Sequence, residues 1–215
     1  MNSALDASAW QAACDSYAEQ SWQAISHPRA AYFASFGALH VAVAELLLER
    51  SDELASIGER RVVHIENTAG LLAVYSPSKR MVQLRAHNTA LAQIARGMVL
   101  SSRIMPSSAD LLDGAAAQGF QTWPIGALYW HYGQASLAAI EHLPKLAQHR
   151  MHIRRFPPID PSALLMRQLH LIHLLSHHEP NFEQLLMLLK DDAHAFVCPD
   201  LASLHLTGTL RMSKA

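Results

Sequence analysis

Four histidines between residues 170 and 178 are the side chains whose type and spacing could do chemistry in this chain. On a helix, at 100° per residue, His170, His173 and His177 lie within about 60° of one another. The i, i+4 pair His173 and His177 can place two imidazoles on one metal ion. The residue after His173 is Leu174, however, and not the glutamate of a metalloprotease motif. Two interpretations stay open: a metal site of a helical enzyme, or a solvated or interface face, which we expect.

A second candidate site is a basic stripe in the middle of the chain. Arg85, Arg96 and Arg103 are separated by 11 and 7 residues, so they would share one face of a long helix. A second basic stretch follows after residue 144, and its members are Lys145, Arg150, Arg154 and Arg155. Such residues bind phosphates, the acidic end of this same chain or an acidic protein partner. Neither stretch is interleaved with aromatic residues that could stack on bases. We therefore expect a protein contact, and a nucleic-acid-binding regulator is the alternative.

Apolar and aromatic clusters offer further contact candidates. Trp123, Tyr129, Trp130 and Tyr132 suggest a core, and Trp130 is also a candidate interface anchor because tryptophan is common at interface hot spots. Residues 185–189 (LLMLL) are apolar over too wide an arc for an exposed helix, which indicates burial or docking.

The motifs of common enzyme classes are missing from the sequence. The chain has no GxxxxGKS/T loop, no GxGxxG after a strand and no GxSxG elbow. Its two cysteines, Cys14 and Cys198, have neither metal nor redox spacing. We therefore expect a non-enzymatic protein without a cofactor.

Composition separates the chain from several classes of protein. Charged residues make up 16% of the 215 positions, against about 25% in a typical domain. Half of the residues are hydrophobic and the net charge is −1, which argues against disorder. The charge is segregated: residues 1–59 hold eight acids and two bases, and residues 60–155 hold four acids and eleven bases. This segregation indicates docking faces.

The elements that must position these side chains are predicted to be helical, because alanine, leucine, methionine and glutamine dominate. Residues 60–66 are expected to form at most one short extended connector. We predict a mostly α, compact, irregular bundle of about seven to nine helices. The predicted helices cover residues 6–25, 28–50, 77–104, 108–119, 122–139, 141–150, 160–177 and 181–190, with one further turn after Pro199.

The Pro157-Pro158 pair is the strongest break in the chain, because proline also restricts the residue before it. We predict a main helical domain over residues 1–155 and a C-terminal helical subdomain, residues 156–215, packed on it. No signal peptide or membrane-spanning run is recognisable, so a cytoplasmic location is expected.

Three stretches carry a resemblance to a known family: residues 17–32 (YAEQSWQAISHPRAAY), residues 81–104, and residues 123–158 (from WPIGALYWHYGQ to RRFPP). Together they resemble the small cytosolic accessory protein of bacterial type III secretion sorting platforms, the SctK/YscK type with its plant-pathogen Hrp branch. The resemblance implies an adaptor without catalytic activity. Its partners would be an inner-membrane ring protein and a pod protein, and it would act at the cytoplasmic face of the inner membrane.

Overall fold

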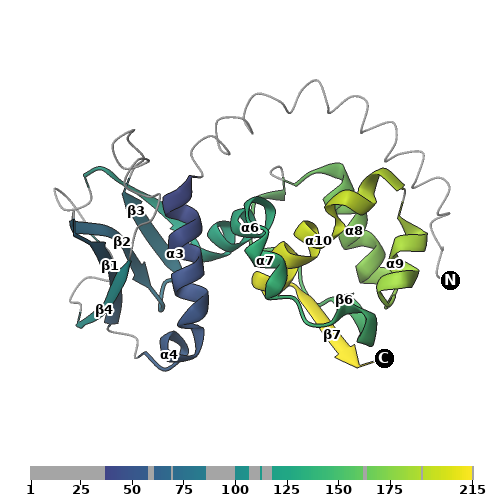
Figure 1. Cartoon of the computed structure of the whole chain (residues 1–215), viewed down its shortest axis with the longest axis horizontal. Helices are drawn as coiled ribbons and strands as arrows, with labels where there is room; N and C mark the ends of the chain where they lie inside the picture. Colours follow the sequence, from purple (N-terminus) through teal and green to yellow (C-terminus); the bar gives the residue numbers. More distant parts are fainter. Residues whose placement is uncertain are drawn as a thin grey trace, which may run out of the picture.

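The structure is a computed structural model, and it describes residues 37–57, 61–68, 70–85, 100–106, 112, 118–161, 164–189 and 191–214. Within these ranges the chain forms two lobes (Figure 1). The elements of the N-terminal lobe are α3 (Ala38–Glu49), α4 (Ser51–Ala55), β1 (Arg61–Asn67), β2 (Gly70–Ser76), β3 (Met81–Arg85), β4 (Ser101–Pro106) and β5 (Phe120–Pro124). Those of the C-terminal lobe are α6 (Ile125–Ala135), α7 (Ala138–Glu141), the 3-10 helix η2 (Leu146–Gln148), β6 (His149–Ile153), α8 (Met166–His177), α9 (Phe182–Leu188), α10 (Asp191–Leu206) and β7 (Leu210–Lys214).

The N-terminal lobe is built on a five-stranded sheet with the strand order β4-β1-β2-β3-β5, in which every pair is antiparallel. β1 and β2 form a hairpin, and Gly70 after the turn has a φ of 112°, which glycine adopts at little cost. The register places Val63 of β1 opposite both Tyr75 of β2 and Ile104 of β4. β1 is therefore an interior strand with a partner on each side.

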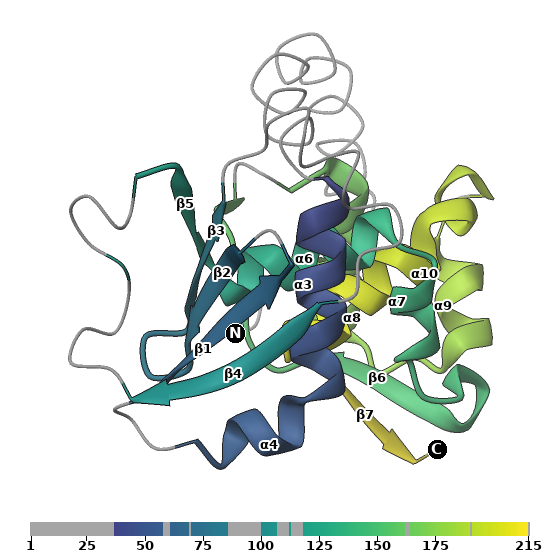
Figure 2. The same ribbon diagram turned by 60° about the vertical axis from the view of Figure 1, so that its left-hand side comes forward.

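One face of this sheet packs against α3, which lies along it in Figure 2. Side chains alternate between the two faces of a strand, so Val63 and Ile65 point to the same side as Val82 and Leu84. All four are at most 1% exposed. The matching side chains of α3 are Leu39, Val43, Ala44 and Leu47. Each buried aliphatic side chain contributes about 1.5–3 kcal/mol, so this contact stabilises the lobe.

The C-terminal lobe has a core of its own between the helices and a two-stranded sheet. β6 and β7 pair antiparallel, and their inward side chains meet those of α8, α9 and α10. The buried residues that build this core include Met151, Leu171, Leu175, Leu185, Leu201, Leu204 and Leu210. None of the helices that the structure describes is long and apolar enough to cross a membrane.

The two cores are joined by α6 and α10, which cross at close range. α6 gives Leu128 and Tyr132 to the core of the N-terminal lobe and Trp130 to the core of the C-terminal lobe. At the crossing, the Ser203 hydroxyl of α10 donates to the Trp130 carbonyl oxygen at 3.0 Å. A Cβ added to Gly133 would lie 2.7 Å from the Ser203 backbone nitrogen, so only glycine fits there.

The sheet overturns the prediction of a mostly α bundle: the fold is mixed, with helices and antiparallel strands. Residues 61–65 were expected to form an unpaired connector, but they belong to β1, which pairs with β2 and β4. The predicted helix over residues 77–104 is also wrong, since β3 and β4 lie at its two ends. Leucine, alanine and methionine favour helices when a segment stands alone, and here pairing with distant strands overrides that preference.

Predictions for the second half of the chain had mixed outcomes. The capping box at Asn181 is confirmed: its side chain accepts from the Gln184 backbone N–H at 2.9 Å, and the Gln184 side chain returns the bond. A helix over residues 141–150 is wrong, because η2 and β6 lie there. The tail after Pro199 holds more than one turn, because Pro199 lies inside α10 and β7 follows. The predicted helix over residues 6–25 lies outside the described residues, and the domain boundary after residue 155 stays a prediction.

His131 of α6 makes the stability of the fold depend on pH. Its side chain is 4% exposed and stands edge-on to Trp123, with ring centroids 6.0 Å apart. Burial lowers its pKa from 6.5 to about 4. Between these two values the unfolded chain binds a proton that the folded chain does not bind. The contribution of neutral, buried His131 to the free energy of unfolding is therefore fully present above about pH 6.5. It is lost progressively as the pH drops toward about 4.

We expect acid to reduce the free energy of unfolding by about 3 kcal/mol through His131. Urea unfolding at neutral pH and near pH 4 measures this loss. His131→Asn should flatten the slope, because asparagine does not titrate in this range. An unchanged slope in His131→Asn would contradict the assignment.

Candidate functional site

The most distinctive surface of the described chain is a basic ribbon. We use this name for β6, β7 and the two arginines after β6, together with the lysine before η2. Its six cationic side chains are all exposed: Lys145, Arg150, Arg154, Arg155, Arg211 and Lys214. Four of them belong to the basic stretch predicted from the sequence, and the pairing of β7 with β6 adds Arg211 and Lys214.

The alternation of side chains along the two strands places Arg150 and Arg211 on the outer face, whereas Lys214 at the end of β7 has the same parity as the inner residue Met212. Directly paired residues share a face, and Met151 pairs with Met212 on the inner face, where Met151 is fully buried. His152 pairs with Arg211 on the outer face. Arg150 is two residues from His152 and lies on that outer face as well. The alternation of apolar and polar residues in Leu210–Lys214 is the signal that could have predicted β7, which the sequence analysis missed.

The charge of the ribbon is not neutralised by carboxylates within the described part of the chain. No acidic residue occurs between His142 and Ile159 or after Asp200. The ion pairs that join described residues lie elsewhere, and none includes a member of the ribbon. Arg155 is tied down by a 3.4 Å hydrogen bond from its guanidinium to the Thr207 carbonyl oxygen. Like charges gathered around one strand pair create a positive potential that attracts an anionic partner.

The arginine stripe predicted for the middle of the chain is arranged differently. Arg85 ends β3 and Arg103 lies in β4, both on the sheet face opposite α3. Two strands lie between them, a separation of about 14 Å. The Arg85 guanidinium lies 5.6 Å from the Phe120 ring centroid, and Arg103 pairs with Glu66 at 3.2 Å. Arg96 lies outside the described residues. The helical stripe is therefore wrong, and a contact role for these arginines stays a prediction.

Trp130 is 2% exposed and belongs to the core of the C-terminal lobe. Its ring therefore supports α6 from inside and is not presented to solvent. The same holds for Trp123, which is 5% exposed.

The histidines of α8 form a stacked surface row. The His173 and His177 rings lie 4.2 Å apart at an angle of 41°, and His177 Nδ1 is 2.9 Å from the His173 carbonyl oxygen. Burial lowers the pKa of His173, and the positive charges of His177, His170 and His178 lower it further. Among the described residues, no group of three or more histidine, cysteine or acidic side chains could hold a metal ion.

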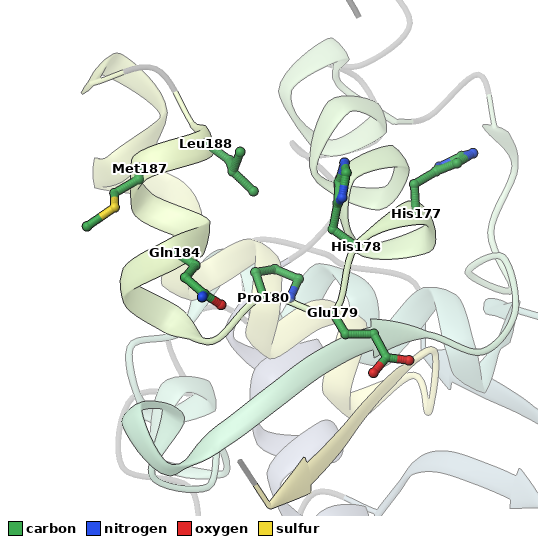
Figure 3. Close-up of a pocket in the computed structure, with 7 residues that line it drawn as sticks. All are labelled: His177, His178, Glu179, Pro180, Gln184, Met187 and Leu188. Carbon is green, nitrogen blue, oxygen red and sulfur yellow. The ribbon is translucent and has the colours of Figure 1, made fainter. Parts of the chain in front are cut away.

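A groove of about 580 Å³ opens between the end of α8 and α9 (Figure 3). Its lining residues are His177, His178, Glu179, Pro180, Gln184, Met187 and Leu188. Within residues 185–189, predicted to be buried or docked, Leu185 is fully buried. Met187 is 82% exposed and Leu188 is 46% exposed. The groove therefore has an apolar rim open to solvent.

A buried polar network at the opposite end of α8 has a structural role that the sequence did not reveal. Asp200 of α10 is 3% exposed. It accepts from Arg167 Nε at 3.1 Å, from Gln134 Nε2 at 2.9 Å and from Gln168 Nε2 at 2.8 Å. These bonds tie α6, α8 and α10 together.

Two surface features of the described residues could bind a partner, namely the basic ribbon and the groove. In comparisons with known proteins, no protein family, no curated protein and no solved structure matches this chain.

Proposed function

We propose that this chain is a non-enzymatic adaptor that binds an acidic surface of another protein through the basic ribbon. The single observation that carries the proposal is the exposed charge of the ribbon, which forms no ion pair with a carboxylate among the described residues. Four of its six cations are arginines, and arginine is enriched at protein interfaces, whereas lysine is depleted there. Arginine also forms planar, bidentate bonds to carboxylates.

We further propose that the adaptor works in a bacterial type III secretion apparatus. It would link the inner-membrane ring to the cytosolic sorting platform and reach the cytoplasmic face of the inner membrane through these partners. The resemblance of residues 123–158 supports this proposal, because that stretch leads from β5 and α6 to the ribbon. Residues 81–104 also resemble that family in sequence. The helix predicted for them is wrong, however, so this stretch adds no structural support to the proposal.

Direct binding tests the adaptor proposal. The purified chain should bind the cytosolic part of the ring protein, or the pod protein, from the same secretion apparatus. Arg150→Glu combined with Arg211→Glu should weaken that binding about tenfold, since reversal adds repulsion to the lost attraction. Arg61→Glu is a matched control, because Arg61 is an exposed arginine on β1 of the N-terminal lobe. Absence of binding to both candidate partners would contradict the proposal.

One observation favours a nucleic-acid-binding alternative: a two-stranded antiparallel ribbon fits the major groove of DNA. Binding of this kind would fall steeply with salt, because phosphate contacts release counterions. Retention of the chain on duplex DNA at low salt, lost in the Arg150→Glu, Arg211→Glu variant, would support this alternative. Lack of retention would remove it.

A further inference from the structure

The face of the five-stranded sheet that does not pack against α3, which we call the second face, carries buried side chains of its own. In Figure 1, α3 stands between the sheet and the C-terminal lobe, so the second face is turned away from that lobe. Direct pairing across the strands aligns one row of side chains on it: Thr122, Gln83, Val74, His64 and Arg103. Val74 is 1% exposed and Gln83 is 5% exposed. Since α3 covers the other face, their burial requires a second cover.

Gln83 holds the backbone of Leu112 against the second face with two hydrogen bonds. The Gln83 Nε2 donates to the Leu112 carbonyl oxygen at 3.0 Å, and the Leu112 backbone N–H donates to the Gln83 Oε1 at 2.8 Å. The N–H and C=O of one residue point to the same side when the backbone is extended, as in a β-strand. The Gln83 amide therefore takes the place of a neighbouring strand and binds an extended segment by its backbone.

Two arginines on the second face favour an acidic segment beside Gln83. Arg85 is two residues further along β3, about 7 Å away. No ion pair between described residues includes Arg85. Arg103, at the β4 end of the row, pairs with Glu66 at 3.2 Å, yet its side chain stays 69% exposed. The Glu66 carboxylate opposes an acidic ligand near Arg103, so we expect binding to depend mainly on Arg85.

The sequence around Leu112 has the matching chemistry. It reads ADLLDG, so Asp110 and Asp113 stand on either side of the leucine pair. Residues 60–155 contain four acids against eleven bases, and two of the four acids stand in this short segment. The chain's own segment thus indicates what the second face accepts, namely an extended backbone at Gln83 with a leucine and carboxylates next to it.

We propose that the second face binds an extended, acidic, leucine-containing segment of a protein partner, and that Leu112 of the chain itself occupies this site as an internal pseudo-ligand. The partner's segment would displace Leu112, form the same two hydrogen bonds with Gln83 and place a carboxylate near Arg85. Backbone hydrogen bonds then give affinity and side chains give specificity, as in other complexes with extended peptides. The inference goes beyond the adaptor proposal, because the second face and the basic ribbon lie in different lobes.

Fluorescence anisotropy with a labelled synthetic peptide of residues 107–117 (SSADLLDGAAA) tests the proposal on the full-length chain. The wild type should bind the peptide weakly, because Leu112 competes for the same site. Leu112→Pro in the chain should strengthen binding about tenfold, since proline lacks the N–H that Gln83 accepts and the site becomes free.

Three changes made in the Leu112→Pro background locate the bound peptide. Gln83→Leu should weaken binding about tenfold, because it removes both hydrogen bonds, and Arg85→Glu should weaken it about fivefold. Gln121→Leu is the matched control and should leave binding unchanged, because Gln121 is an exposed glutamine of β5 that pairs with Leu84 and so does not lie on the second face. A peptide with lysine in place of both aspartates should bind about tenfold more weakly.

Three results would each overturn the inference. They are equal binding by Leu112→Pro and wild type, a gain of binding that survives Gln83→Leu, and loss of peptide binding in Arg150→Glu with Arg211→Glu, which would place the peptide on the basic ribbon. A wild-type dimer in analytical ultracentrifugation that Gln83→Leu abolishes would assign the second face to a second copy of the chain instead. The two proposals use different residues and ligands, so either can fail without the other.

Discussion

Gly133→Ala is expected to lower the free energy of unfolding by about 2–4 kcal/mol, because the α6–α10 crossing leaves no room for a Cβ. That Cβ would lie 2.3 Å from the Ser203 Oγ and 2.7 Å from the Ser203 Cα and backbone nitrogen. A side-chain hydroxyl can rotate away, but the backbone of α10 cannot. The helices would have to separate, which disturbs both cores that they join.

The sign of this effect is diagnostic. In an ordinary helix interior, replacing glycine by alanine stabilises by about 1 kcal/mol. Urea unfolding of Gly133→Ala therefore separates the two cases, and any gain in stability would contradict the close crossing. Combining it with Ser203→Gly should restore only part of the loss, because the Ser203 backbone contacts remain. Ala135→Gly, at the exposed end of α6, is the control and should cost about 1 kcal/mol or less.

Asp200→Ala should cost about 3–5 kcal/mol, because it removes the common acceptor of a buried network. The Arg167 guanidinium would lose its carboxylate, and the Gln134 and Gln168 amides would each lose a hydrogen-bond acceptor. An unsatisfied buried polar group costs about 1–3 kcal/mol. The Arg167 Cζ also lies 4.4 Å from the Phe196 ring centroid. This contact would keep the guanidinium close to the position that the Asp200 carboxylate had occupied.

A double-mutant cycle in urea checks this prediction. Arg167→Met in the Asp200→Ala background should recover part of the loss, because it removes the unpaired cation. Asp200→Asn retains one acceptor oxygen and should cost less than Asp200→Ala. A loss below about 1 kcal/mol in Asp200→Ala would show that water replaces the carboxylate and that the network does not hold the helices together.

Local signals in the sequence were sufficient for some elements. Asn181 and Gln184 exchange hydrogen bonds within one helical turn, so the start of α9 could be predicted without the rest of the fold. The predicted helix start at Thr122 is too early, because residues 122–124 end strand β5 and α6 begins at Ile125. The prediction at Asn181 succeeded because the bonds that decide it join residues that are near in sequence.

The sheet could not be predicted in this way. β2 (GLLAVYS) and β3 (MVQLR) contain good helix formers, and their strand conformation depends on partners in the sheet. β1 is paired with β4, which follows about 40 residues later. Strand preference reflects packing against such neighbours more than the backbone preference of each residue. The prediction of a mostly α fold was wrong for this reason.

For the candidate site, the sequence by itself determined that the charge is segregated and that Arg150, Arg154 and Arg155 belong to a basic stretch. Only the tertiary structure decided that Arg211 lies beside them, because the β6–β7 pairing joins segments about 60 residues apart. It also decided which side chains face solvent. Composition is a property of the chain, whereas a surface exists only once distant segments pack together.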